Sequence, residues 1–595
     1  MTRILPLLLL SVACAGAAAA PQPIQDRSGA SMPELVERYS VDRNALERFY
    51  SIGVSEARRG RLTAFHDAWL TRLAEVDFGP LDTSERIDHV LLRTELEYQR
   101  GREASEHERL ARLAELLPFA ADIVALEEAR WSVEPIDFEA VAGALHRLGE
   151  AVAAVRERVE LEDAEPEEAA EPAEDDEPDA APLAVRAVDA FWLAPRVDDL
   201  RRALGEWYRH YHLYAPGFAW WCEEPYERLV DELEGYAEHL RETVAGQTGE
   251  DDDPLLGDPI GADGLAADLA LEIIPYSPAE LIAIGERQFA WCEAEMKRAA
   301  AEMGLGDDWK AALERVKSDH APPGGQDALV LALAEESIAF LDERELVTIP
   351  ALCRETWRVR MISKGGQRFL PFAAYGGQRM DVAFPTADME HDSKRMAMRG
   401  NNVHFTRAIT HHELIPGHHL QGFMEQRHAT HRREFDTPFL GEGWALYWEM
   451  LLWDLGWHRS PENRIGMLFW RMHRAARIVV SLGFHLERMS PEEMIDFLVE
   501  RVGHERDNAT AEVRRFIGGA YSPLYQCAYM IGGLQLMALR AELVDSGRMT
   551  NREYHDAILH QGPVPIEMIR AALLDQPPAR DHRAAWRFAG EVQGR

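Results

Sequence analysis

The sequence AITHHELIPGHHLQGF, residues 408–423, places four histidines and a glutamate among apolar residues. It approaches the metal-binding pattern His-Glu-x-x-His, but a Pro-Gly pair stands where the second histidine is expected. Two chelating histidines on one helix usually lie four residues apart, about 40° apart around the axis. His412 and His418 are six residues apart, and His411 and His418 would stand about 10.5 Å apart along a regular helix. An unbroken helix therefore offers no chelating pair, because zinc–ligand bonds are about 2.1 Å long.

The Pro416–Gly417 pair offers a way to bring two of these histidines together. A proline within a helix removes one backbone hydrogen bond and clashes with the preceding turn, and glycine accepts backbone angles that other residues resist. We expect a bulge or widened turn at these two residues inside a continuing helix, which resumes through HHLQGFMEQ (418–426). Glu413 would then face a metal-activated water as its general base.

A third protein ligand is expected, because catalytic zinc sites use three and leave one position open. The segment DTPFLGEGWALYWEMLLW (436–453) begins with Thr437 and Pro438, which is typical of a helix start. The residues that follow are apolar nearly all round, so the helix is predicted to be buried. Glu442 and Glu449 lie on one face of it, and a buried carboxylate needs a partner. Glu442 follows His418 by 24 residues, enough for the chain to turn back and pack a second helix against the first; hydrogen-bonded core histidines are the alternative interpretation.

Helical periodicity dominates the rest of the chain, which predicts a mainly α fold with at most a small β element. Ser-Pro pairs at 277–278 and 490–491 have the residue types of an N-cap followed by a first-turn proline. The stretches 346–352 and 368–376 are the best candidates for strands.

Two breaks divide this helical pattern. The stretch EDAEPEEAAEPAEDDEPD carries eleven acidic residues and cannot bury enough apolar surface to fold. We predict a disordered acidic loop over 162–182 within an N-terminal helical region, 28–245. A second break, 246–264, separates it from a C-terminal helical region, 265–595, which contains the candidate metal site.

The N-terminus has the pattern of a secretory signal peptide over residues 1–20: one basic residue, an apolar run too short to span a bilayer, and small residues. The mature protein is therefore expected to be periplasmic or secreted. Lipid anchoring through Cys14 is the less favoured alternative, because Ser11 stands where a branched apolar residue is expected. No later stretch has the ~18 apolar residues of a membrane span. The four remaining cysteines are expected to be buried free thiols, and the net charge of −38 argues against nucleic acid as a partner.

Four motifs together resemble a known family. They are HELIPGHHLQ (412–421), EGWALYWE (442–449), YQCAYMIGGLQLMALR (525–540) and YHDAILHQGPVPIEMI (554–569). The chain resembles the domain of unknown function 885 family, which is similar to the gluzincin metallopeptidases. The resemblance implies a two-lobed helical fold with a deep channel, like that of carboxypeptidase Taq, oligopeptidases and angiotensin-converting enzyme.

The resemblance also implies roles for individual residues. His412, His418 and Glu442 would hold one Zn²⁺, Glu413 would be the general base, and Tyr529 would stabilise the oxyanion. The family's Pro-Gly-Gln before this tyrosine is replaced here by Pro-Leu-Tyr, which makes tyrosines nearby secondary candidates. From the residues themselves, further candidates to orient a ligand or contact substrate are His411, His419, Glu449, Tyr521, Tyr525 and Arg515, the last because an arginine fork matches a carboxylate. A core or supporting histidine is the favoured interpretation of His419, and an ordinary surface arginine is an equal alternative for Arg515.

We therefore expect an exported zinc metallopeptidase that acts on a peptide or small amide substrate. A second hypothesis keeps the site but gives it a non-peptide amide or ester. A third is a non-catalytic metal- or ligand-binding protein, and Glu413 argues against it because metal binding alone does not need that residue. Two histidines and a carboxylate could also hold Fe(II).

Overall fold

The protein is mainly α-helical, as predicted, and is described over residues 30–590 by a computed structural model. The residues within that range that the structure does not describe are 163–180, 214, 250–252 and 368–369. The predicted signal peptide with Cys14, and all but the ends of the predicted acidic loop (162–182), therefore lie outside the described residues.

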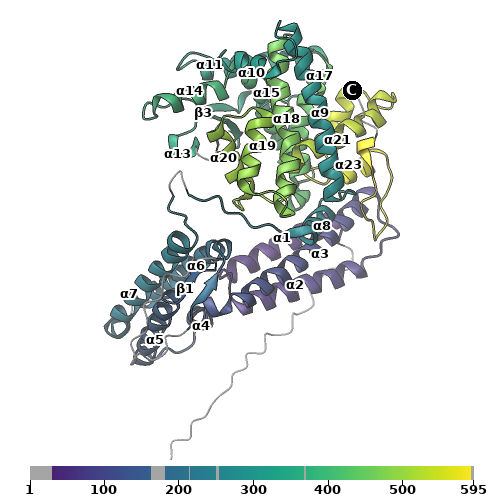
Figure 1. The fold of residues 1–595 in the computed structure, drawn as a ribbon. Coiled ribbons are helices and arrows are strands. Elements are labelled where there is room, and N and C mark those ends of the chain that lie inside the picture. Colours follow the sequence, from purple (N-terminus) through teal and green to yellow (C-terminus); the bar gives the residue numbers. More distant parts are fainter. Residues whose placement is uncertain (1–29, 163–180, 214, 250–252, 368–369, 591–595) are drawn as a thin grey trace, which may run out of the picture.

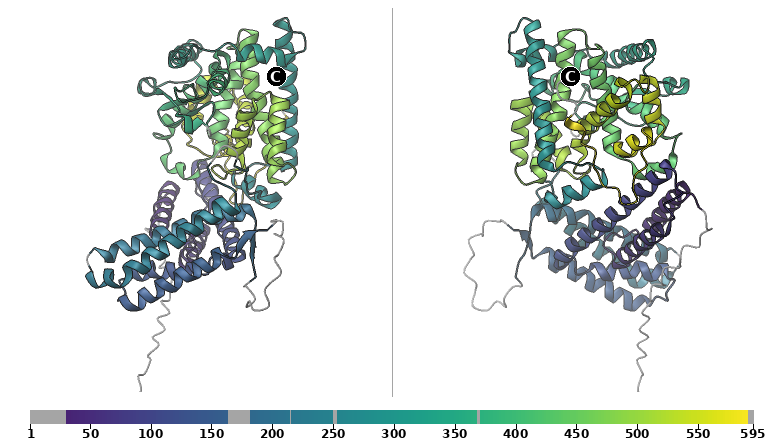
Figure 2. Two further views of the ribbon diagram at one scale, coloured as in Figure 1. Left: turned by 60° about the vertical axis from the view of Figure 1, so that its left-hand side comes forward. Right: turned by 90° about the vertical axis from the view of Figure 1, so that its right-hand side faces the viewer.

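The first seven helices form the lower part of the molecule in Figure 1, and Figure 2 shows α4–α7 side by side there. Their bounds are α1 Met32–Phe49, α2 Glu56–Glu75, α3 Thr83–Arg112, α4 Ala120–Trp131, α5 Phe138–Arg156, α6 Ala187–His212 and α7 Pro216–Glu238. Helices α4–α7 enclose a hydrophobic core of their own. Helices α1–α3 instead share a core with helices of the C-terminal region. The break at 246–264 thus separates α4–α7 from the rest, whereas α1–α3 pack with the region that contains the candidate metal site.

The remaining helices form the upper part of the molecule. Their bounds are α8 Gly261–Leu271, α9 Pro278–Glu302, α10 Trp309–Lys317, α11 Gln326–Glu343, α12 Ala351–Glu355, α13 Lys364–Gln367, α14 His391–Gly400, α15 Val403–Glu413, α16 His418–Glu425, α17 Pro438–Asp454, α18 Pro461–His485, α19 Pro491–Phe497, α20 Arg506–Ile517, α21 Tyr525–Arg540, α22 Asn551–Leu559 and α23 Ile566–Leu573. The predicted helix starts are confirmed: Ser277, Thr437 and Ser490 are N-caps whose side chains accept a backbone N–H of the first turn.

Two small sheets complete the described fold, and one of them lies over the candidate site. The strands are β1 Val159–Leu161, β2 Leu183–Val185, β3 Arg358–Met361, β4 Ala373–Tyr375 and β5 Arg379–Val382. β1 and β2 are parallel; β5 pairs parallel with β3 and antiparallel with β4. The strand predicted in 368–376 is confirmed only as β4. The strand predicted over 346–352 is wrong: Val347 and Ile349 are buried in a loop, and α12 begins at Ala351. Their apolar character reflects core burial and not strand pairing.

Within the described part of the chain, one helix, Tyr525–Asp545, has the length and composition of a membrane span. Of its most apolar window, 72% is buried inside the protein. The helix packs along α17 in the upper part of the molecule, so its apolar residues belong to that core. The four cysteines of the described residues are free and buried, as predicted.

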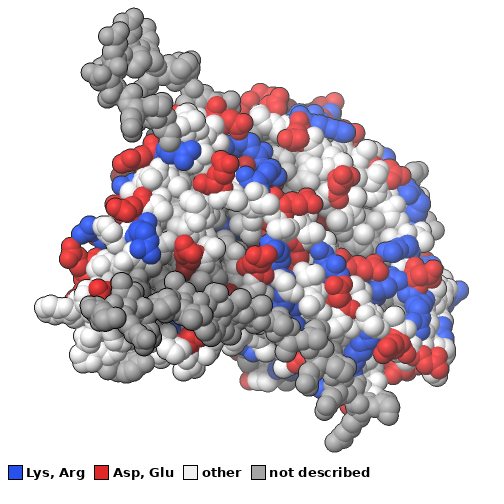
Figure 3. All heavy atoms as spheres, turned by 90° about the horizontal axis from the view of Figure 1, so that it is seen from below, with Lys and Arg blue, Asp and Glu red and all other residues white. Residues whose placement is uncertain are grey.

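Figure 3 shows the molecule from below, with acidic and basic side chains interspersed over the described surface of that face. No continuous basic patch of the kind that binds nucleic acid is seen among the described residues there.

Helices α17 and α21 approach so closely that their backbones touch. A Cβ added at Gly532 would overlap the carbonyl oxygen of Phe439, and one added at Gly443 would overlap the backbone of Gly532. These two glycines therefore allow the helix with Glu442 to pack directly against the helix with Tyr529.

We predict that Gly532→Ala lowers the free energy of unfolding by about 2 kcal/mol or more, because an added methyl must push the two backbones apart. Gly441→Ala is the matched control on α17: nothing lies within 4 Å of its added Cβ, and alanine is the better helix former by about 1 kcal/mol. Urea unfolding of both variants checks this. Equal stability of the two variants would contradict the backbone contact.

Candidate metal centre

The predicted bulge inside one continuing helix is wrong, because the structure has two helices here. Helix α15 ends at Glu413, the next four residues form a turn with a cis Ile415–Pro416 peptide, and α16 begins at His418. The physical reason lies in the backbone hydrogen bonds. In an α-helix each N–H donates to the carbonyl four residues earlier, whereas the N–H of Gly417 donates to the carbonyl of His411, six residues earlier, at 3.0 Å. Helix α16 nevertheless covers nearly all of 418–426, the segment predicted to be helical after the Pro-Gly pair.

The turn is fixed by glycine and by two neighbouring helices. A Cβ at Gly417 would overlap the carbonyl oxygen of His412, so the chain can fold back only with glycine here. The indole of Trp444 on α17 donates to the carbonyl of Pro416 at 2.8 Å. The hydroxyl of Ser337 on α11 donates to the carbonyl of Ile415 at 2.9 Å. The turn is thus tied to the helix that contains Glu442.

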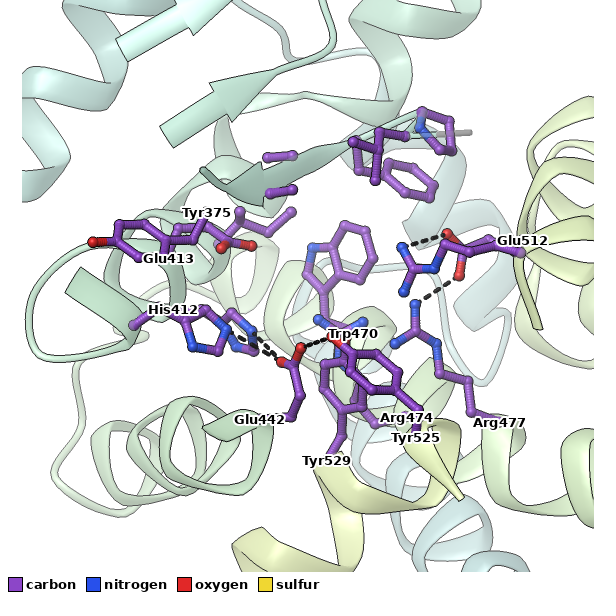
Figure 4. A pocket seen from close by; sticks show the side chains of 18 of the residues that line it. Tyr375, His412, Glu413, Glu442, Trp470, Arg474, Arg477, Glu512, Tyr525 and Tyr529 are labelled. Atoms are coloured by element: carbon purple, nitrogen blue, oxygen red, sulfur yellow. Dashed lines mark hydrogen bonds and ion pairs between the residues drawn. The ribbon is translucent and has the colours of Figure 1, made fainter. Parts of the chain in front are cut away.

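This turn brings together the three side chains predicted as metal ligands. One ligand atom from each of His412, His418 and Glu442 lies within 4.8 Å of the others. Oε2 of Glu442 lies 3.5 Å from Nε2 of His412 and 3.2 Å from Nε2 of His418. The two imidazole planes are nearly perpendicular, at 86°. Figure 4 shows the His412 ring and the Glu442 carboxylate directed at each other.

The spacing of these atoms fits a tetrahedral zinc ion. Bonds of 2.0–2.2 Å in a tetrahedron put neighbouring ligand atoms about 3.4 Å apart, close to both measured distances. Oε2 of Glu442 is buried and accepts no hydrogen bond in spite of its two imidazole neighbours. A buried carboxylate oxygen without a hydrogen bond is costly, and a cation bound there would remove the cost. The residues present therefore fit zinc.

Glu449 supports the first ligand from behind. Its Oε1 lies 2.7 Å from Nδ1 of His412, so this imidazole nitrogen donates to it and leaves Nε2 free to face the site. A carboxylate behind a ligating histidine fixes its tautomer and raises its basicity. Glu442 and Glu449, seven residues apart on α17, thus have different roles. Glu442 is itself a candidate ligand, and Glu449 supports His412, another candidate ligand.

Burial and charge act against each other on this cluster. Burial disfavours the charged form of His412, but the neighbouring Glu442 carboxylate and the hydrogen bond to Glu449 outweigh it and raise its pKa to about 9. Burial likewise works against the Glu442 carboxylate, and the charge of His418 together with the neighbouring His412 holds its pKa well below the usual range. In the absence of metal, His412 is therefore protonated at neutral pH.

The predicted catalytic residues line the same cavity of about 290 Å³. Glu413 is buried and belongs to its wall; in Figure 4 it lies above His412, with Glu442 below. Tyr525 donates its hydroxyl to Glu442, and the hydroxyl of Tyr529 lies 3.5 Å from that of Tyr525. The ring of Tyr529 is stacked on the imidazole of His412, with centroids 6.2 Å apart. Two tyrosine hydroxyls thus lie beside the candidate ligands.

The structure separates the other predicted histidines from the ligand cluster. His411 is absent from the cavity wall; its Nδ1 lies 3.0 Å from the carbonyl of Arg407, and its ring faces Trp457 and His458. His419 is a buried, hydrogen-bonded histidine between the carbonyl of Cys353 (2.9 Å) and the hydroxyl of Tyr375 (3.2 Å). Tyr375 lines the cavity, so His419 supports its wall.

Sequence reasoning missed further functional candidates in the cavity wall. They are Tyr375, Trp470, Arg474, Arg477 and Glu512, which line the cavity together with the predicted Arg515 and Tyr521. The arginines of α18 had a signal in the sequence: they recur every three residues within the apolar run IGMLFWRMHRAARIVV, the same pattern of buried charge that singled out Glu442. Tyr375 had no such signal, because a short strand places it.

Comparisons with known proteins agree with the motifs. The family described as "Bacterial protein of unknown function (DUF885)" matches residues 50–573. The chain belongs to the DUF885 family. Two solved structures are similar to this DUF885 protein: a "putative lipoprotein of unknown function" from Shewanella oneidensis (TM-score 0.64, 15% identity, covering 92% of this chain and 100% of that one) and a "putative lipoprotein" from Colwellia psychrerythraea (0.55, 16%, 92% and 99%). At these identities they show the fold alone. No curated protein matches the sequence.

We predict that Glu449→Gln weakens zinc binding about 10–100-fold, because the amide no longer supports His412 as a carboxylate does. Asp454→Asn is the control: it is a carboxylate of the same helix that does not line the cavity. A competitive chelator titration measures both affinities. Wild-type affinity in the Glu449 variant would show that this residue does not support a metal ligand.

Zinc affinity should also depend on pH. A protonated His412 must lose its proton to bind metal, so the apparent affinity should rise between pH 6 and pH 9 and level off above its pKa of about 9. At pH 7, binding should release at least one proton per zinc. Calorimetry in buffers of different ionisation enthalpy measures this number, and a value of zero would contradict the assigned charge state.

Proposed function

We propose that the protein is an exported zinc-dependent metallohydrolase that cleaves peptide bonds. The observation that supports it most is the convergence of His412, His418 and Glu442 at tetrahedral spacing, with Glu413 in the same cavity. A site for binding metal alone needs no free carboxylate next to its ligands. Bound to these three side chains, zinc supplies Lewis-acid activation of water and of a substrate carbonyl.

The chain's own residues supply the proton transfer and the oxyanion contacts. Glu413 accepts a proton from the attacking water and passes it to the leaving amine. Tyr529 donates a hydrogen bond to the carbonyl oxygen as negative charge develops on it, beside Tyr525, whose own hydroxyl donates to Glu442. Burial raises the pKa of Tyr529, so its hydroxyl keeps its proton for that role. Glu449 holds the His412 ring in its orientation throughout.

The proposal includes a likeness to the helical gluzincin peptidases, with two lobes around a channel, because the order of the motifs is the same. It also includes export. The two similar structures are each described as a "putative lipoprotein", which supports export and makes the state of Cys14 a direct question for mass spectrometry of the mature N-terminus.

We predict that Glu413→Gln keeps one zinc per chain and lowers turnover by about 10²–10⁴-fold, because it removes the general base and leaves the ligands intact. His418→Ala should instead lose the metal. Zinc content by elemental analysis and hydrolysis of a mixed library of peptides, amides and esters measure both effects.

The library also separates the alternatives. Cleavage of amides or esters but not of peptides would replace the peptidase by a related hydrolase at the same site. A Gln variant as active as wild type would refute the role of Glu413, and a zinc-loaded wild type inert on the whole library would favour a binding protein.

A further inference from the structure

Three arginines form one wall of the cavity beside the metal centre. Arg474 and Arg477 come from α18 and Arg515 from α20. Arg474 is 6% and Arg477 is 2% exposed. Figure 4 shows Arg477 and Glu512 on the side of the cavity opposite His412, and Arg474 between the two groups. This wall holds three buried or nearly buried positive charges.

One carboxylate on this wall is shared by two of the arginines. Oε2 of Glu512 accepts from Arg477 at 2.6 Å, and its Oε1 lies 3.7 Å from Arg515. His473 holds Glu512 in place at 3.1 Å. The pairing of Glu512 is therefore complete, and it leaves two positive charges in excess on the wall.

Arg474 has no carboxylate partner among the described residues. Its guanidinium lies over the rings of Tyr529 (4.6 Å) and Trp470 (5.2 Å), and its Nε is buried without a hydrogen bond. The carboxylates of Glu442 and Glu449 act on it electrostatically, but each is paired with a histidine, Glu442 with His418 and Glu449 with His412. A buried guanidinium without a directly bonded anion is costly, so an anion that enters the cavity would find a partner at this position.

We propose that Arg474 binds a carboxylate of the substrate; this rests on the proposed hydrolase function and adds the substrate class. An arginine fork matches a carboxylate through two parallel hydrogen bonds. The ring of Tyr529 lies between the two groups, 4.6 Å from Cζ of Arg474 and 6.2 Å from the His412 ring. The guanidinium of Arg474 is thus at most about 11 Å from the His412 ring, and one residue spans about 3.8 Å.

The substrate class follows from this reach. The carboxylate stands within about three residues of the scissile amide, so it is either the free C-terminus of a peptide that loses its last one to three residues, or an acidic side chain near the bond. Tyr521, under the guanidinium of Arg515, and Tyr525 offer hydroxyls on the same wall. Uncharged amides lack the group that the wall requires.

The test uses the full mature protein without metal, so that it does not depend on hydrolysis. Calorimetry compares an N-acetylated dipeptide with a free C-terminus, its C-terminal amide, and the amide with a glutamate side chain. Wild type should bind one of the two carboxylate forms about 10–100-fold more tightly than the uncharged amide, and which of them binds identifies the source of the carboxylate.

Arg474→Gln should remove this preference. Arg471→Gln is the matched control: Arg471 is one turn earlier on α18, is 4% exposed, and donates to Gln288 at 3.0 Å outside the cavity. It should keep the full preference, with a similar change in folding stability. Loss of the preference in both variants, or its survival in Arg474→Gln, would overturn the assignment.

Two further results separate the two proposals. If zinc binds and peptides are cleaved without any carboxylate preference, the anion site is refuted and the hydrolase stands. If the carboxylate preference is found but zinc does not bind, the anion site stands and the hydrolase fails. Inorganic phosphate or chloride that binds as tightly as the peptide carboxylate would show a general anion site and overturn the substrate class.

Discussion

Gly417 lies against the carbonyl oxygen of His412, and this contact is the constraint on which the candidate site depends. It lets the chain reverse within four residues, so two histidines six apart in sequence end one helix and begin the next. Without the turn, the two imidazoles would point in different directions around one axis. The turn is also bonded to Trp444, which sets the position of α17 and with it Glu442.

Helix α17 joins the ligand, its support and the neighbouring hydroxyls in one rigid unit. It contains Glu442 and Glu449, and through Gly443 it touches the backbone of α21, which contains Tyr525 and Tyr529. Because side chains on packed helices lose little freedom on binding, such a unit holds a metal ligand and a hydrogen-bond donor in fixed relation. The buried charges are arranged in the same way: carboxylates gather around the histidines, and arginines gather across the cavity, where Glu512 pairs with two of the three.

The sequence predicts the parts of this site that rest on local rules. The N-cap and proline of α17 and the apolar character around Glu442 have short-range causes, and both predictions are confirmed. The Pro-Gly pair disturbs the helix, as expected, but the predicted bulge is wrong because the helix ends there. What depends on distant contacts could not be read in the same way. The turn splits the helix fully because Trp444 and Ser337 bind its carbonyls, and the buried segment 346–352 is a loop because the core, and not a neighbouring strand, covers it. The role of Arg474 needs α20 and α21 in place around it.

The central claim is that His412, His418 and Glu442 bind one zinc ion. Anomalous diffraction at the zinc absorption edge, from crystals of the mature chain purified with zinc, tests it most directly. The account predicts one peak per chain, about 2.0–2.2 Å from Nε2 of both histidines and from a carboxylate oxygen of Glu442. A peak at any other place, or a fully folded chain with no peak at these three residues, would contradict it.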